Sequence, residues 1–157
     1  MSSYTNGYNK NSSNKNFGTQ NKKPFTTQPP RKAEPLNKTD YVKQAENIIR
    51  EHLEQSNKCI TSNKIRNVLT LMNELYNMAR VDSKPELDEK TLSHIQYVKM
   101  RLVYESGRDD TVKSFINYSG LLSHLDSIKN NKEELFLVCR YTEALVAYHK
   151  FYAPKER

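Results

Sequence analysis

The side chains that most often carry out acid–base or metal chemistry are scattered along this sequence. The chain has four histidines, His52, His94, His124 and His149, and each falls on a different predicted helix. None has a second His or Cys three or four residues away, which is the spacing that puts two metal ligands on one helix face. The sequence therefore indicates no metal site.

The acidic and glycine residues also lack a catalytic pattern. Asp109–Asp110 and Glu133–Glu134 are adjacent pairs at predicted helix starts, where carboxylates interact favourably with the helix dipole. Neighbouring residues do not share a helix face, so neither pair forms an acid–base centre. The four glycines form no phosphate-binding loop. We expect a protein that is not an enzyme and that needs no cofactor.

A pattern suited to nucleic acid occurs on one predicted helix. Advancing 100° per residue places Leu92, Ile95 and Leu102 within about 60° of one direction, which we take as the core. On the opposite side, between about 180° and 240°, lie two arginines and two tyrosines. Arginine and tyrosine interleaved in this way can hold a phosphate backbone and stack bases. These four residues are Tyr97, Arg101, Tyr104 and Arg108.

Other interpretations of these basic residues remain open. The stripe is also compatible with a solvated face on which Tyr and Arg contact each other at i, i+4. Lys64 lies near the start of another predicted helix and would suit a phosphate there. Arg66 lies on the other flank of that helix, so the two are not expected to bind one ligand together.

The elements that position these residues are all predicted to be helical. Apolar residues recur at three- and four-residue spacing, and no segment alternates with a period of two. The last segment is apolar on nearly every side, which is typical of a helix at the centre of a bundle or covered by a partner. The sequence predicts an all-α, compact bundle of about five helices: 40–55, 62–79, 88–106 ending at Gly107, a fourth from Asp109 or Asp110 to about 128 that Gly120 kinks or splits, and 132–153.

The charge is concentrated at the N-terminus. Residues 1–38 hold seven Lys/Arg and one Glu, out of a net charge of +7 for the chain. This segment is rich in Asn, Ser, Lys and Pro and has no apolar period, so we predict a disordered basic tail, which either tethers RNA loosely or only aids solubility. Residues 39–157 form the bundle domain and are nearly neutral, so a nucleic-acid site there requires local segregation of charge.

No membrane segment is predicted. The N-terminus has no apolar signal core, and apolar runs such as Leu135–Cys139 are far too short to span a bilayer. We expect a soluble, cytoplasmic protein with no membrane partner.

Three stretches together resemble a known family. They are TSNKIRN (61–67), KMRLVYESGR (99–108) and YTEALVAYHKF (141–151). In order and spacing they are similar to the small helical subunit of type III-A CRISPR (Csm) effector complexes, over about residues 40–153. The third stretch is the most specific of the three.

This resemblance implies a fold, partners and site residues. It implies a compact bundle of about five helices, present in a few copies beside the guide-bearing backbone subunits and touching the large polymerase-like subunit. Contacts to guide and target RNA would go mainly to the backbone, and cleavage would belong to other subunits of this antiviral system. The basic residues inside the three stretches would be the RNA contacts: Lys64, Arg66, Arg101, Arg108 and Lys150.

Two functions follow as alternatives. The first is a non-catalytic RNA-binding small subunit that braces the effector filament. The second is a helical protein-interaction adaptor without nucleic-acid contact, whose last helix is the docking surface.

Overall fold

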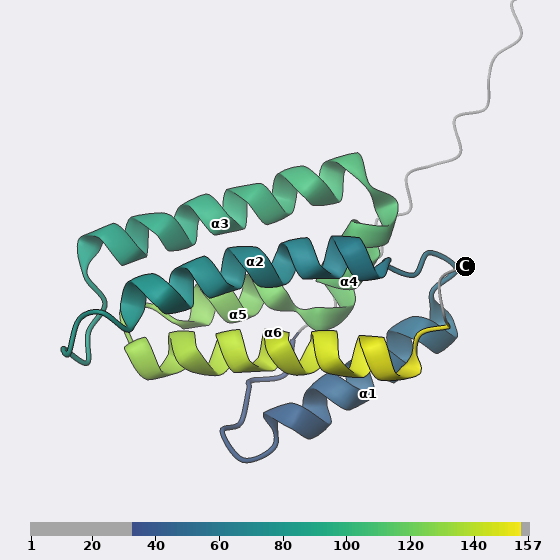
Figure 1. Cartoon of the computed structure of the whole chain (residues 1–157), viewed down its shortest axis with the longest axis horizontal. Coiled ribbons are helices and arrows are strands. Elements are labelled where there is room, and N and C mark those ends of the chain that lie inside the picture. The colour runs from purple at the N-terminus through teal and green to yellow at the C-terminus, as the bar shows by residue number, and fades with distance from the viewer. Residues whose placement is uncertain (1–32, 155–157) are drawn as a thin grey trace, which may run out of the picture.

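The structure, a computed structural model, describes residues 33–154, and these residues form a bundle of helices without strands (Figure 1). The predicted all-α bundle is confirmed, with the fourth predicted helix divided in two at Gly120. The disorder predicted for residues 1–38 falls mostly outside the described residues. The helices are α1 (Tyr41–Gln55), α2 (Ser62–Ala79), α3 (Glu89–Arg108), α4 (Asp110–Ser119), α5 (Leu121–Ser127) and α6 (Lys132–Tyr152).

Polar side chains cap the N-termini of three helices: Asp88 caps α3, Asp109 caps α4 and Asn131 caps α6. Asp88 accepts a hydrogen bond from the Thr91 N–H at 2.8 Å, and this bonding lowers the pKa of the Asp88 carboxyl. The Asn131 side chain accepts from the backbone N–H groups of Glu133 and Glu134, at 2.9 and 3.3 Å. Each bond satisfies an N–H group that has no partner inside the first helical turn.

The predicted end of α3 at Gly107 is wrong. Gly107 is helical and α3 continues to Arg108. The helix ends because Asp109 adopts an extended conformation while its carboxylate accepts from the Thr111 N–H at 2.9 Å, which begins α4. Asp109 therefore ends one helix and starts the next, and the sharp turn between α3 and α4 needs no glycine.

Gly120 separates α4 from α5, as the sequence predicts. Its φ of 63° lies in the left-handed region, which glycine adopts without steric cost. The site is also crowded, because a Cβ added at Gly120 would lie 2.4 Å from the Cβ of Ala33. The segment before α1 thus packs over the junction of α4 and α5.

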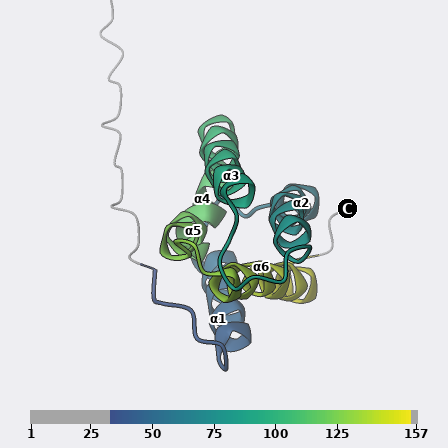
Figure 2. The ribbon, with the colours of Figure 1, turned by 90° about the vertical axis from the view of Figure 1, so that its left-hand side faces the viewer.

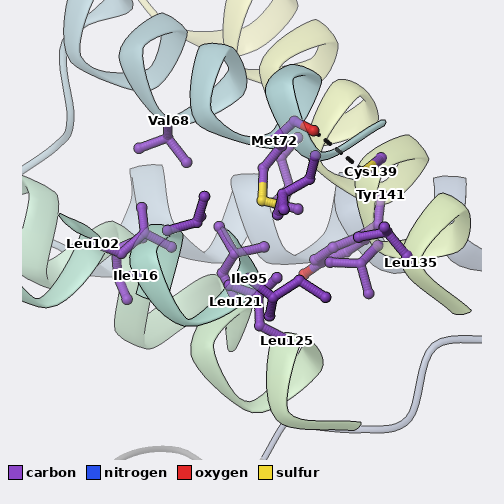
Figure 3. Packing of buried hydrophobic residues seen from close by; sticks show 14 of the residues in the cluster. Val68, Met72, Ile95, Leu102, Ile116, Leu121, Leu125, Leu135, Cys139 and Tyr141 are labelled. Atoms are coloured by element: carbon purple, nitrogen blue, oxygen red, sulfur yellow. Dashed lines mark hydrogen bonds between the residues drawn. The ribbon is translucent and has the colours of Figure 1, made fainter. Parts of the chain in front are cut away.

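The last helix is the centre of the bundle. α6 packs against α1, α2 and α5, while α3 and α1 lie on opposite sides of the molecule (Figures 1 and 2). In the core, the Cys139 thiol donates to the Met72 carbonyl at 3.5 Å (Figure 3). The Tyr141 hydroxyl donates to the Ser119 carbonyl at 2.9 Å. Burial raises the pKa of Cys139 to about 12, so this thiol stays protonated. Among residues 33–154, no helix has the length and hydropathy needed to cross a membrane.

Candidate nucleic-acid interface

Most of the predicted RNA contacts lie near helix termini that meet at one end of the bundle. There the start of α2 meets the junction of α3 and α4, with the end of α6 close by (Figure 1). Lys58, in the connection between α1 and α2, forms an ion pair with Asp110. The hydroxyls of Ser56 and Ser114 share a hydrogen bond of 2.9 Å. These contacts join segments more than fifty residues apart in the sequence.

Lys64 is held by the start of α4. Its Nζ lies 2.5 Å from Asp109 Oδ2 and donates to the Thr111 hydroxyl at 3.2 Å. Hydrogen bonds from Lys64 and Thr111 hold the pKa of the Asp109 carboxyl far below its usual value. Asp109 therefore remains charged across the physiological pH range, which suits an ion pair and not proton transfer.

Arg101 and Arg108 share one carboxylate. Arg101 Nη2 lies 3.4 Å from Glu105 Oε1, and Arg108 Nη1 lies 3.8 Å from Glu105 Oε2. The Arg108 guanidinium also lies over the Tyr104 ring, 5.4 Å from its centroid. The intrahelical contact considered as an alternative for this stripe is thus present. Arg101 Nε is buried and has no hydrogen-bond partner among the described residues.

A hollow of about 320 Å³ between α2 and α3 brings these groups together. Lys64, Arg101, Glu105 and Asp109 line its polar side, and the apolar remainder includes Val68 and Leu102 of the core. Arg108 does not line the hollow but shares Glu105 with Arg101, so the connected ion pairs contain three cations and two carboxylates. The excess of one positive charge can attract an anion such as a phosphate, and the carboxylates keep that attraction weak.

The other two predicted contacts lie elsewhere. Arg66 is exposed on α2, about 200° around the helix from Lys64. Lys150 is exposed on the last turn of α6. The structure thus places two of the five predicted residues, Lys64 and Arg101, in one hollow, links Arg108 to them through Glu105, and leaves Arg66 and Lys150 on separate surfaces.

The outer face of α3 is unusually apolar. Tyr97 and Tyr104 are 43% and 56% exposed, on the side that their helical phase predicts. Met100 and Val103 are 55% and 57% exposed on the same helix. Four large side chains therefore cover the surface of α3 that faces away from the core.

The buried histidines serve packing. His52 Nε2 accepts from the Ile60 N–H at 3.4 Å, and His149 Nε2 donates to the Ile60 carbonyl at 2.8 Å, so they fasten the connection between α1 and α2 to the end of α6. Burial, and secondarily the charge of His149, lowers the pKa of His52 to about 4, and burial lowers that of His124 to about 4. Within residues 33–154, no group of three or more His, Cys, Asp or Glu side chains is placed to hold a metal ion.

The sequence reasoning missed the acidic partners. Glu105 and Asp109 determine how available the three cations are, and Lys58 with Asp110 completes the charged cluster. The spacing of Glu105 to Arg101 and Arg108, four and three residues, was the available signal for the first of these. The pairing of Lys64 with Asp109 depends on packing between helices and has no such local signal.

Comparisons with known proteins give a consistent result. A family model described as Csm2 Type III-A matches residues 36–155. The chain is 39% identical to the CRISPR system Cms protein Csm2 of Mycobacterium tuberculosis (strain ATCC 25618 / H37Rv) over 119 residues, which are 75% of this chain and 95% of that protein. It is 37% identical to the Csm2 protein of Streptococcus thermophilus over 124 residues, which are 77% of this chain and 98% of that protein.

Proposed function

Because the chain belongs to the Csm2 family of type III-A CRISPR proteins, it is a component of a multi-subunit Csm complex, and we propose that it is the non-catalytic RNA-binding small subunit of that complex. In this role it contacts the backbone of the guide and target RNA and braces the effector filament in the cytoplasm. The observation that carries the proposal is the hollow that Lys64 and Arg101 line together, with Arg108 joined to Arg101 through the carboxylate of Glu105.

The charge arrangement supports weak binding by one copy. Phosphate contacts carry no base information, so an interface of this kind leaves the choice of sequence to base pairing. Since two carboxylates offset the three cations, a single bundle is expected to bind RNA weakly. Neighbouring copies in the complex multiply the contacts and supply affinity through effective concentration.

The apolar face of α3 supports the bracing role. Met100 and Val103 point away from the core and are more than half exposed, and such surfaces are often buried by protein partners. We assign this face to contact with neighbouring subunits, whether the large subunit, the backbone subunits or another copy of this chain. The two roles use different sides of α3, with the arginines on one flank and Met100 and Val103 on the other.

The competing adaptor hypothesis places its docking surface on the last helix. In this fold α6 packs on α1, α2 and α5, and nine of its residues, from Lys132 to His149, are buried within the bundle. Apart from Phe151 and Tyr152 on its last turn, α6 leaves no large apolar side chain exposed for a partner, which favours the RNA-binding subunit.

The test removes the two arginines of α3. In the assembled complex, Arg101→Gln with Arg108→Gln is expected to weaken RNA binding to a similar degree across unrelated sequences, because both contacts go to phosphates. Each lost contact removes about 0.7 from the slope of log K against log salt for a single strand, so the slope changes by about 1.4. Glutamine avoids placing three carboxylates on one helix face around Glu105.

The matched control is Arg80→Gln with Arg140→Gln, which removes the same charge from two exposed arginines outside the hollow. Salt titrations of both double variants and of the unaltered complex are compared at equal subunit stoichiometry. The proposal is wrong if the α3 variant keeps its affinity and slope, or if the control changes them equally.

A further inference from the structure

A second surface that combines aromatic rings with cations lies where the end of α6 packs on α1. The Tyr148 and Tyr152 rings are stacked, with centroids 6.0 Å apart and planes at 14°. The Phe151 ring stands at 87° to Tyr152, with centroids 4.9 Å apart. The Arg50 guanidinium lies over the Tyr152 ring, 5.6 Å from its centroid. We call Arg50, Tyr148, Phe151 and Tyr152 the α1–α6 cluster; the exposed Lys150 precedes Phe151 on the same last turn of α6.

The cluster holds its rings in fixed positions. The Tyr152 hydroxyl donates to Glu46 Oε1 at 2.5 Å, which ties the end of α6 to α1 and engages the carboxylate of Glu46. Tyr152 is in turn flanked by Tyr148, Phe151 and Arg50. Phe151 therefore packs edge-to-face against the Tyr152 ring, although it does not belong to the core.

Phe151 is the most exposed large apolar side chain in any of the six helices, at 77%. The fold gains little from a phenyl ring in this position, because most of its surface remains in water. A ring that is exposed, supported by a second ring and adjacent in sequence to an exposed lysine offers a face for a planar partner and a cation for an anionic one.

We propose that Phe151 stacks an unpaired base of single-stranded RNA while Lys150 and Arg50 attract the neighbouring phosphates. The proposal rests on the proposed RNA-binding function and adds a second contact to it. Stacking on aromatic side chains tolerates any base, and a base inside a duplex does not expose its face. The ligand is thus an unpaired stretch of strand and not the guide–target duplex.

The chemistry of the cluster favours nucleic acid over a protein partner. Its exposed side chains are aromatic or cationic, and its nearest carboxylate, Glu46, is hydrogen-bonded to Tyr152. The cluster is also separate from the hollow, because residues of α2, α3 and the start of α4 line the hollow and no residue of α1 or α6 does. The two contacts can therefore be removed independently.

The test uses the absence of tryptophan from the sequence. In the full chain, Phe151→Trp introduces a single indole at the proposed stacking position. A uridine oligonucleotide is expected to quench its fluorescence along the same binding curve that the anisotropy of a dye-labelled oligonucleotide reports. An abasic oligomer with the same number of phosphates is expected to bind more weakly and to quench much less.

Two sets of variants serve as controls. Val81→Trp places the reporter at another exposed position, 84% exposed in the connection between α2 and α3, and no quenching is expected there. Phe151→Leu keeps an apolar side chain but removes the ring, and we expect about a fivefold or greater loss of affinity. Phe151→Tyr keeps the ring and is expected to bind as the unaltered chain does.

Each other outcome overturns the inference in a recognisable way. Equal quenching by abasic and uridine oligomers, or unchanged affinity of Phe151→Leu while RNA still binds, overturns the stacking contact and leaves the proposed function standing. Indole emission that depends on protein concentration without RNA identifies the cluster as a protein interface instead. Failure of the full chain to bind any RNA at low salt overturns the stacking contact together with RNA binding by the free subunit.

Discussion

Glu105 controls the two arginines of α3. It accepts from Arg101 and lies 3.8 Å from Arg108, so one carboxylate occupies donors on both side chains that would otherwise face a phosphate. Exposed ion pairs of this type contribute only about 0.2–1 kcal/mol each, and phosphate can compete with them. In the proposed RNA-binding role, a phosphate therefore competes with Glu105 for the donors of these two arginines.

This competition gives a prediction in the opposite direction to the arginine variants. Glu105→Gln keeps the size of the side chain and removes its charge, so Arg101 and Arg108 become more available to phosphate. We expect about two- to fivefold tighter RNA binding by the complex, from the energy of exposed ion pairs. The measurement is a binding titration at low salt, with Glu143→Gln on the exposed face of α6 as the control. Weaker or unchanged binding by Glu105→Gln would show that the arginines do not meet phosphate.

For single residues, the sequence predicted which helix face a side chain occupies better than it predicted which side chains of other helices lie beside it. Helical phase alone placed Arg101 and Arg108 opposite the core, because phase depends only on the geometry of one helix. It could not place Lys64 beside Arg101, because their common hollow depends on how α2 packs against α3 and α4. Arg66 and Lys150 were assigned from resemblance, and whether they contact RNA stays a prediction.

Two glycines near helix ends have opposite roles at the scale of the elements. Gly107 lies inside α3, and a Cβ added there would meet nothing within 4 Å. Gly120 has φ of 63° and lies against Ala33. Sequence patterns treat both as helix-ending residues, which is why the end of α3 was predicted too early while the break at Gly120 was predicted correctly. The difference arises from Asp109, whose capping bonds fix the turn between α3 and α4.

The same pair of glycines provides a matched stability test. Gly120→Ala is expected to destabilise the bundle by more than the roughly 1–2 kcal/mol that a left-handed conformation costs a non-glycine residue, since its Cβ would also clash with Ala33. Gly107→Ala is expected to stabilise it by up to about 1 kcal/mol, because alanine is the better helix former. Thermal or urea denaturation followed by circular dichroism measures both. Equal stability of the two variants would contradict the roles assigned to these glycines.

At the scale of the whole molecule, the folded domain begins earlier than residue 39, where the sequence analysis placed its boundary. Leu36 packs on the core, and the Gln44 side chain donates to the Pro35 carbonyl at 3.0 Å and accepts from the Asn37 N–H at 3.2 Å. Part of the stretch that was assigned to the tail therefore contacts the bundle. A single leucine among prolines and lysines has no period, so no sequence pattern indicates that Leu36 belongs to the folded domain.

Two truncated chains locate this boundary. A chain that begins at Ala33 retains the contacts of Leu36 and Ala33 and is expected to melt as the full chain does. A chain that begins at Asn37 loses them and is expected to be less stable by about 1 kcal/mol or more, in proportion to the apolar surface that it exposes. Calorimetry on both chains tests the point. Equal melting of the two would place the boundary after residue 36, as the composition of residues 1–38 predicts.

The first helix of the bundle packs against the last, and this order matters while the protein is being made. At about 5–20 residues per second, a ribosome needs on the order of ten seconds to proceed from α1 to the end of α6. During that time the apolar side chains of α1, such as Ala45 and Ile49, have no α6 to cover them. The nascent chain therefore depends on chaperones or on its own solubility until synthesis finishes. A translation product that stops before α6 lacks the helix against which α1, α2 and α5 pack, so it cannot form this bundle.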